Sequence, residues 1–96
     1  MTELEDRVIG VLVMLAVGEV VSYGDVADTA GFPGRSRAVG TILGQTDVDV
    51  PWWRVVRADG SIATPRAVGQ AALLRGEGAV IRHGRVVEAP LGRFRR

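Results

Sequence analysis

Two helix signals and a turn rich in glycine and proline divide the first half of this chain into short segments. Ser22 stands where a helix N-cap is expected, and a helix from about Tyr23 to Ala30 would end at Gly31. The following Phe32-Pro33-Gly34 favours a turn, because neither proline nor glycine continues a helix at low cost. A further helix is expected from about Ser36 to Gln45. The chain is therefore restricted to short helices that pack across tight turns.

An earlier helix is indicated near the start of the sequence. Thr2 and Glu5 have the spacing of a capping box. Apolar residues then recur with a helical period at Leu4, Val8, Val11, Leu12 and Leu15. We expect Gly18 to end this helix. The apolar run from Val8 to Val17 is too short to span about 30 Å of hydrocarbon, so it predicts a core helix and no membrane segment.

The second half of the chain predicts short strands. Trp52 to Val56 has the apolar, β-favouring content of a short buried strand. Residues Ala79 to Val87 divide around His83-Gly84 into a hairpin that would form a wing beside the helices. The expected fold class is mainly α with a small β-hairpin, a winged helix-turn-helix-like single domain over residues 1–96. It ends in a basic tail, about 89–96, whose last residues Arg93-Phe94-Arg95-Arg96 are expected to be mobile.

A last helix is predicted between these strands. Thr64 is placed to cap it, with Pro65 at its first position, where the missing N–H costs nothing. Val68, Ala71 and Leu74 have the spacing of one buried face.

Residue counts exclude several classes of chemistry. The 96 residues contain no cysteine, which removes disulfides, thiolate zinc sites and cysteine nucleophiles together. The one histidine, His83, cannot form a metal cluster or a Ser/His/Asp set, so we expect neither a metal nor another cofactor. The acidic start of the sequence lacks the basic segment of a signal peptide, and a cytoplasmic location is the default expectation.

Charge is distributed unevenly, although the net charge is only +1. Residues 1–50 hold three arginines against eight carboxylates, a balance of −5. Residues 51–96 hold nine arginines against three carboxylates, a balance of +6. A basic half favours a polyanionic partner such as nucleic acid.

Two short helices joined by a turn that contains glycine resemble a helix-turn-helix, whose second helix enters a groove of DNA. Opposite its apolar positions, the 36–45 helix carries a face of small or polar residues: Arg37, Gly40, Thr41 and Gly44. Each glycine inside a helix destabilises it by roughly 1 kcal/mol relative to alanine, so the two glycines on this face need an explanation. Close approach of another backbone, such as that of DNA, is one explanation, and packing against the N-terminal helix or a loop is the other.

Four ordered blocks carry a resemblance to a known family over about Val20 to Val80. The blocks are Val21-Ser22-Tyr23-Gly24-Asp25-Val26-Ala27, Ser36-Arg37-Ala38-Val39-Gly40, Pro51-Trp52-Trp53-Arg54-Val55-Val56 and Leu73-Leu74-Arg75-Gly76-Glu77-Gly78. In this order they resemble the DNA-binding domain of O6-alkylguanine-DNA alkyltransferases. Those repair proteins have Pro-Cys-His-Arg-Val where this chain has two tryptophans after the proline, and their cysteine accepts the alkyl group.

Tryptophan in place of that cysteine is typical of alkyltransferase-like proteins, which bind alkylated guanine in DNA and transfer nothing. Trp52 fits this pattern, whereas Trp53 departs from it, because those proteins usually keep the histidine. The resemblance also places Glu77 at the position of a glutamate that relays a proton in the transferases. Because thiol and imidazole are both missing, we interpret Glu77 as structural, bonding nearby backbone N–H groups.

The resemblance implies a mode of DNA binding. The family's recognition helix lies in the minor groove, the target nucleotide is flipped out, and an arginine fills the vacated space. That arginine maps to Arg37, and Tyr23 maps to a tyrosine that presses on the phosphate beside the flipped nucleotide. Gly40 and Thr41 would belong to the face that approaches the DNA backbone, and Arg35 is expected among the DNA contacts.

The resemblance also implies a lesion pocket, which Trp52, Val55 and residues around Ala63 to Arg66 would line. Because neighbouring residues of a strand point to opposite sides, we expect Trp52 to face this pocket and Trp53 to pack elsewhere. Whether Arg66 contacts the lesion is open, because its spacing differs by one residue from that of the family's arginine.

These observations give one main hypothesis and two alternatives. The main hypothesis is a monomeric, non-enzymatic sensor that binds O6-alkylguanine in double-stranded DNA, flips the nucleotide and marks the lesion for another pathway, by resemblance nucleotide excision repair. The first alternative is a winged-helix regulator that reads DNA sequence through base-reading side chains. The second is an interaction module that has lost DNA binding. Alkyl transfer is not expected, since indole cannot replace a thiolate as acceptor.

Overall fold

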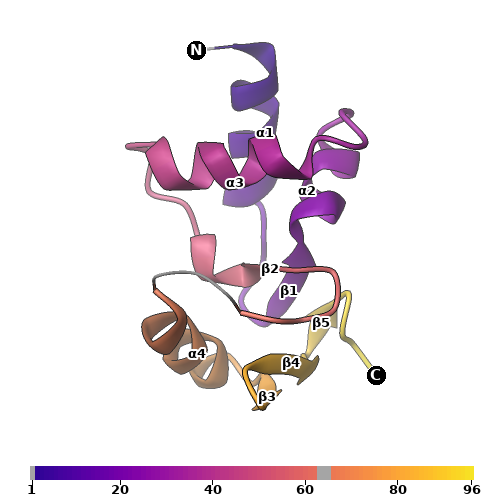
Figure 1. Cartoon of the computed structure of the whole chain (residues 1–96), viewed down its shortest axis with the longest axis vertical. Coiled ribbons are helices and arrows are strands. Elements are labelled where there is room, and N and C mark those ends of the chain that lie inside the picture. The colour runs from indigo at the N-terminus through magenta and orange to yellow at the C-terminus, as the bar shows by residue number, and fades with distance from the viewer. Residues whose placement is uncertain (1, 63–65) are drawn as a thin grey trace. The chain divides into compact units, whose positions relative to one another are not determined.

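The computed structural model describes residues 2–62 and 66–96, and these residues form two compact units (Figure 1). The helical unit comprises the residues up to Leu15 together with Tyr23–Trp52. The sheet unit comprises Ala16–Ser22 together with Trp53–Arg96. Each unit therefore draws on two separate stretches of the sequence.

Three helices make up the helical unit: α1 (Glu3–Val13), α2 (Tyr23–Thr29) and α3 (Ser36–Gln45). They pack on one another, and Figure 1 shows α3 running across α1. The apolar side chains that they bury are Val8, Leu12, Val26, Ala27, Val39 and Ile42. In the turn after α2, the Phe32 N–H donates to the Ala27 carbonyl at 2.9 Å. The expected helix-turn-helix is thus confirmed.

Helix α1 begins as predicted but ends early. The Thr2 hydroxyl oxygen accepts a hydrogen bond from the Glu5 N–H at 3.1 Å, which satisfies one of the free donors of the first turn. At the other end, the Met14 N–H donates to the Val11 carbonyl at 3.2 Å, a tighter pattern that closes the helix. The prediction that Gly18 ends α1 was wrong.

A separate turn explains this early ending. The Glu19 carboxylate accepts the Ala16 N–H at 2.9 Å, so this donor is used in a local loop rather than in a continued helix. Gly18 has a φ of 86°, which favours glycine and turns the chain into the first strand.

The sheet unit contains parallel strands that the sequence did not predict. Strand β1 (Glu19–Ser22) lies between β2 (Val55–Val56) and β5 (Leu91–Gly92), and both neighbours run parallel to it. The expected hairpin is confirmed as β3 (Val80–Arg82) and β4 (Arg85–Glu88), which pair antiparallel around His83-Gly84. The fold class is therefore the expected one, mainly α with a small hairpin, with a short parallel sheet added.

The basic tail is tied to the sheet unit, contrary to the expectation of a mobile end. Strand β5 pairs Gly92 with Val20, and the Arg93 Nε donates to the Ala58 carbonyl at 2.9 Å. Phe94 packs against the apolar core of this unit. That core also contains Val20, Val56, Leu74, Ala79, Val86 and Ala89, with Trp53, Ile62 and Ile81 packed against it. Both apolar packing and backbone pairing thus tie the tail to the sheet unit.

The tryptophan segment is a helical turn rather than a strand. Residues Trp52–Arg54 form a 3₁₀ turn, η1, and only Val55–Val56 are extended. The predicted strand was therefore wrong for its first three residues, including both tryptophans. Two tryptophans before a β-branched pair suit a strand by content alone, but here the Trp52 N–H bonds the Val50 carbonyl at 2.8 Å and folds the backbone back on itself.

Helix α4 (Ala67–Gly76) buries a polar side chain where an apolar one was expected. Val68 is 89% exposed, so its place in the predicted inner face was wrong, whereas Leu74 is fully buried as predicted. Gln70 takes the inner position at 1% exposure, and its Nε2 donates to the carbonyls of Trp53 at 3.1 Å and Val55 at 2.9 Å. The predicted cap Thr64 and first residue Pro65 lie outside the described residues.

Among the described residues, every helix is too short or too polar to cross a membrane.

We expect Gln70→Ala to destabilise the protein by roughly 2–3 kcal/mol, because it removes the side-chain donor to the Trp53 and Val55 carbonyls and opens a small cavity. Urea unfolding measures the free energy of unfolding. Val68→Ala on the same helix is the matched control and should change it by less than about 0.5 kcal/mol, since Val68 is exposed. Equal effects of the two substitutions would contradict the assigned inner face.

Candidate nucleic-acid interface

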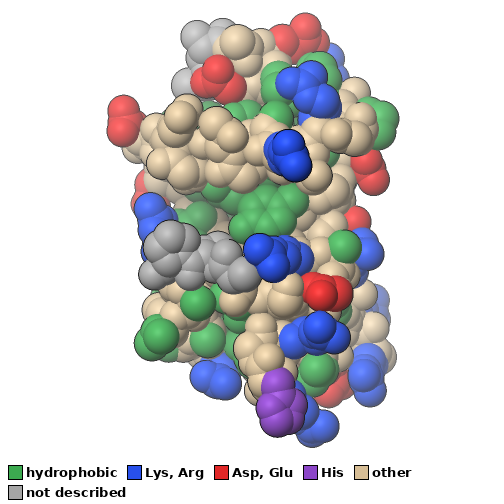
Figure 2. All heavy atoms as spheres, viewed as in Figure 1, with side chains coloured by type: hydrophobic (Ala, Val, Ile, Leu, Met, Phe, Trp, Pro, Cys, Tyr) green, Lys and Arg blue, Asp and Glu red, His purple; other side chains and the backbone are tan. Residues whose placement is uncertain are grey.

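The outward face of α3 is small, polar and open. Arg37, Thr41 and Gly44 are exposed, and the Thr41 hydroxyl donates to the Arg37 carbonyl at 3.2 Å. Figure 2 shows this stretch of α3 mostly in tan, the colour of backbone and uncharged polar side chains. On the inner side Val39 and Ile42 are buried, so the predicted division of the helix into two faces is confirmed.

The structure removes one explanation for the glycines on this face. No described residue outside the local helix lies within 4 Å of a Cβ built on Gly44. At Gly40, the one such neighbour among the described residues is the Tyr23 ring, whose Cε1 would lie at 3.9 Å, an ordinary van der Waals distance. Packing against α1 or a loop therefore does not require either glycine, and close approach of DNA at this face stays a prediction.

The predicted DNA-contacting residues share the helical unit. Tyr23 begins α2 and is partly buried beside Gly40 of α3. Arg35 is exposed and immediately precedes α3, while Arg37 lies in its first turn. The fold places Tyr23 of α2 next to Gly40 of α3, and within α3 the Thr41 hydroxyl bonds the Arg37 carbonyl. Their contacts with DNA stay a prediction.

The residues assigned to the lesion pocket are distributed over both units. Trp52 is partly buried at the end of the helical unit, whereas Val55, 1% exposed, belongs to β2 of the sheet unit. Arg66 is exposed just before α4, and Ala63 lies outside the described residues. The pocket accordingly stays a prediction.

Trp53 has a defined structural role. Its indole Nε1 donates to the Glu77 Oε2 at 3.1 Å, and the Arg54 guanidinium lies 5.2 Å from the centre of its ring. The side chain packs against the core of the sheet unit. The strand alternation used to separate the two tryptophans does not apply in this 3₁₀ turn, and the orientation of Trp52 toward a pocket stays a prediction. The indole thus combines apolar packing with a hydrogen bond to a charged group.

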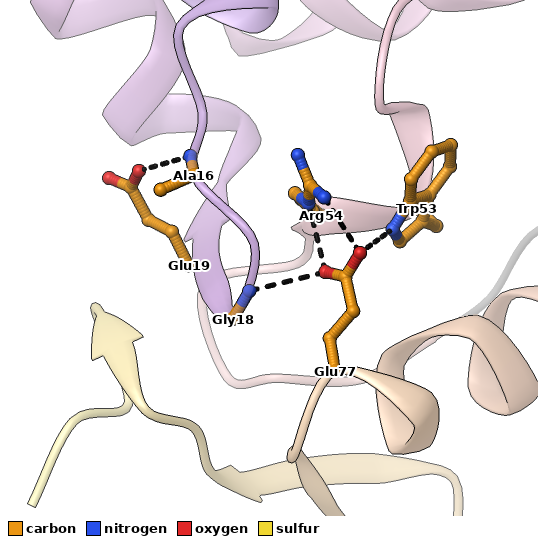
Figure 3. A network of polar contacts seen from close by, with 6 residues as sticks. All are labelled: Ala16, Gly18, Glu19, Trp53, Arg54 and Glu77. Atoms are coloured by element: carbon orange, nitrogen blue, oxygen red, sulfur yellow. Dashed lines mark hydrogen bonds and ion pairs between the residues drawn. The ribbon is translucent and has the colours of Figure 1, made fainter.

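Glu77 gathers four hydrogen bonds at the end of α4 (Figure 3). Its Oε1 accepts from the Arg54 Nε at 2.9 Å and from the Gly18 N–H at 3.3 Å. Its Oε2 accepts from the Arg54 Nη2 at 2.7 Å, in addition to the Trp53 indole. The expected bond from a backbone N–H to Glu77 is confirmed at Gly18, whereas the other three donors are side-chain groups of Arg54 and Trp53. Sequence reasoning missed the partnership with Arg54, because a long-range ion pair leaves no local spacing signal.

These contacts fix the charge state of the pair. Hydrogen bonding to the Arg54 guanidinium lowers the pKa of the Glu77 carboxyl, with smaller lowering contributions from Gly18 and Trp53, while desolvation opposes them. The same hydrogen bond raises the pKa of Arg54. Both side chains are largely buried, and such a pair is costly to break because it leaves an uncompensated charge.

Comparison with known proteins identifies what the chain is similar to. Residues 3–79 match the model of the family described as 6-O-methylguanine DNA methyltransferase, DNA binding domain. A DNA base-flipping protein from Vibrio parahaemolyticus is 36% identical over 59 residues, which are 59% of this chain and 59% of that protein. A methylated-DNA–protein-cysteine methyltransferase from Mycobacterium bovis is 40% identical over 63 residues, 64% of this chain but only 38% of the enzyme. The chain thus covers less than two thirds of either relative.

A solved structure gives a broader match. S. pombe Atl1, in complex with damaged DNA containing O6-carboxymethylguanine, has a TM-score of 0.75 and 28% sequence identity. The match covers 85% of this chain and 82% of that chain. It therefore extends over most of both chains, unlike the match to the cysteine methyltransferase.

We expect Glu77→Gln to lower the free energy of unfolding by roughly 2 kcal/mol at neutral pH. Because the folded pKa of Glu77 lies below its ordinary value, its contribution is present at neutral pH and is lost as the pH falls through the folded value. The difference between wild type and variant should therefore shrink as the pH falls below the ordinary glutamate pKa of about 4.3. Glu88→Gln, an exposed carboxylate on β4, is the control and should change little at either pH. A pH-independent difference for Glu77→Gln would contradict the charged pair.

Proposed function

Because the chain belongs to the family of the 6-O-methylguanine DNA methyltransferase DNA-binding domain, we propose that it is a non-enzymatic sensor of O6-alkylguanine in duplex DNA. The observation that carries this proposal is the outward face of α3, where Arg37 stands beside glycines that the fold itself does not require. A relative named as a base-flipping protein and a related structure bound to alkylated DNA support the same function.

In this proposal α3 lies in the minor groove of the duplex. Glycine at 40 and 44 lets the helix backbone come close to the sugar-phosphate chain, which bulkier side chains would prevent. Arg37 then enters the space of the flipped nucleotide, where its planar guanidinium can stack and hydrogen-bond inside the duplex. Tyr23 presses on the neighbouring phosphate from α2, and Arg35 and Thr41 add contacts to the backbone.

The lesion lowers the free-energy cost of flipping the nucleotide. Extruding a base costs a few kcal/mol, and less when its pairing is already weakened, as it is by an alkyl group on O6. Trp52 would offer the extruded base a broad apolar wall, with Val55, Ala63 and Arg66 contributing to the pocket. The discrimination between damaged and undamaged guanine then combines easier flipping with the fit of the alkyl group.

Recognition without reaction follows from the residue types. The chain has no cysteine, whereas several of its relatives are named as cysteine methyltransferases. Glu77 uses its four hydrogen bonds on Arg54, Trp53 and Gly18, so it has a structural task in place of a proton relay. The flagged lesion would pass from a monomeric sensor to another pathway, nucleotide excision repair by resemblance. The chain needs no cofactor for this function.

A regulator that reads DNA sequence is the competing function. It needs side chains that reach base edges from the exposed face of α3. Two of the four positions on that face are Gly40 and Gly44, which have no side chain that could reach a base edge. The structure therefore favours the regulator less than the lesion sensor.

We expect a competitive titration to show tighter binding to a duplex with one O6-methylguanine than to the same duplex with guanine, at one fixed salt concentration. Arg37→Ala should weaken binding to the damaged duplex by roughly tenfold or more, about 1.4 kcal/mol, and binding to the undamaged duplex much less. Arg75→Ala, an exposed arginine of α4, is the control. Equal affinity of the wild type for both duplexes would contradict the sensor function. Covalent transfer of a labelled alkyl group from the DNA to the protein would contradict it as well.

The glycine face gives a second, independent prediction. Gly44→Leu should raise the free energy of unfolding by roughly 0.5–1 kcal/mol, because leucine favours a helix and no described residue outside the local helix lies within 4 Å of a Cβ built there. The same substitution should weaken DNA binding about tenfold or more, since the side chain holds α3 away from the duplex. Gly10→Leu is the matched control: Gly10 is also exposed inside a helix, α1, with no described neighbour within 4 Å. It should stabilise the protein and leave DNA binding unchanged. Unaltered DNA binding by Gly44→Leu would rule out close approach at this face.

A further inference from the structure

A charged surface lies in the sheet unit, at the turn that follows β2. The Gly60 N–H donates to the Arg57 carbonyl at 2.8 Å, and the Arg57 N–H donates to the Ser61 carbonyl at 3.2 Å. The Asp59 Oδ1 accepts the Ser61 N–H at 2.9 Å, and the Val86 N–H donates to the Gly60 carbonyl at 2.8 Å. The turn is thus closed by its own hydrogen bonds and fastened to the hairpin strand β4.

Three arginines from distant parts of the sequence meet at this turn: Arg57, Arg85 and Arg93, called here the arginine cluster. Arg57 opens the turn, the Arg85 Nη2 lies 3.3 Å from the Asp59 Oδ2, and the Arg93 Nε donates to the Ala58 carbonyl. All three are exposed, and Figure 2 shows blue side chains gathered over the region of β4 and β5. The cluster thus gathers three arginines at one turn, two of which, Arg85 and Arg57, act on the Asp59 carboxylate.

The Arg93 hydrogen bond to Ala58 ties the tail to this turn, but fold stability does not account for the two arginines beside Asp59. An ion pair as exposed as Arg85 with Asp59, whose side chains are 55% and 54% exposed, contributes between nothing and about 1 kcal/mol. Bringing further cations to the same turn adds repulsion between like charges. Hydrogen bonds from the Ser61 side chain and backbone lower the pKa of the Asp59 carboxyl, with smaller contributions from Arg85 and Arg57. This one anion therefore has a local task and two cations beside it. An external anion would relieve the repulsion.

The geometry points to a second DNA contact: we propose that the arginine cluster binds phosphates of duplex DNA, in addition to the contacts of α3. This inference rests on the proposed function. The guanidinium fork matches the oxygens of a phosphate, and phosphate contacts position a protein on DNA without reading sequence. The cluster would therefore raise affinity for any duplex and leave the preference for the lesion to Arg37 and the pocket.

Salt dependence tests the cluster directly. For each phosphate contact, the slope of log K against log salt concentration changes by about 0.9. Arg57→Gln/Arg85→Gln should make the slope less steep by about 1 to 2, and should weaken binding to damaged and undamaged duplexes by the same factor. Arg75→Gln, outside the cluster, is the control and should leave the slope unchanged.

A gain of affinity provides the sharper test. Asp59→Asn removes the one carboxylate of the turn, while the asparagine Oδ1 can still accept the Ser61 N–H and keep the turn closed. Binding to both duplexes should therefore tighten by roughly two- to fivefold at low salt, with the lesion preference unchanged. Thermal unfolding of each variant checks that the fold is intact.

The outcomes separate this inference from the proposed function. An unchanged salt slope in the double variant, or no gain in Asp59→Asn, would overturn the second contact even if lesion preference persists. Loss of lesion preference in the double variant would overturn the assignment to phosphates. If the wild type shows no lesion preference but the slopes change as expected, the cluster stands as a DNA contact and the sensor function fails.

Discussion

The hydrogen bonds to one carboxylate organise the sheet unit. Glu77 receives donors from the loop before β1, from both Trp53 and Arg54 in η1, and it lies itself at the end of α4. A largely buried anion is unfavourable unless it is paired, so these segments must meet at one place for the unit to form. Arg54 supplies the opposite charge with two hydrogen bonds to Glu77, and the Trp53 indole supplies a neutral donor to the Glu77 Oε2. Gln70 completes the arrangement by holding the Trp53 and Val55 carbonyls from α4.

Local signals in the sequence predicted the helical unit well and the sheet unit poorly. The Thr2 cap, the turn at 32–34 and the two faces of α3 depend on residues that are close in sequence, and all were found as expected. Strands β2 and β5 have only two residues each, and their partner in β1 is far away in sequence, so no periodicity reveals them. The same holds for Gln70, which would have been recognised only as a polar residue on an apolar helix face. Phe94 was the overlooked sign that the basic tail is anchored.

The candidate site shows a similar division. The sequence could place Tyr23, Arg37 and the glycine face on two adjacent helices, because the helix period fixes which residues share a face. It could not decide why the glycines are there, since that depends on which atoms surround them. Nor could it predict that Arg57, Arg85 and Arg93, which are far apart in the sequence, meet at the turn after β2. The tryptophan pair is divided by structure as well as by role: Trp53 anchors the sheet unit, and Trp52 is the residue proposed to meet the base.

The position of β1 between two parallel neighbours also sets an order for folding during synthesis. The helical unit uses residues up to 15 and 23–52, so all of its parts exist before any residue of α4 has been translated. The two ends of β1 acquire partners at different times: Val21 and Ser22 pair with Val55 and Val56, whereas Glu19 and Val20 pair with Leu91 and Gly92, and contacts of such large sequence separation form late. On the ribosome, which releases the N-terminal part first, one edge of β1 would therefore stay without its strand partner until residues 91 and 92 have emerged.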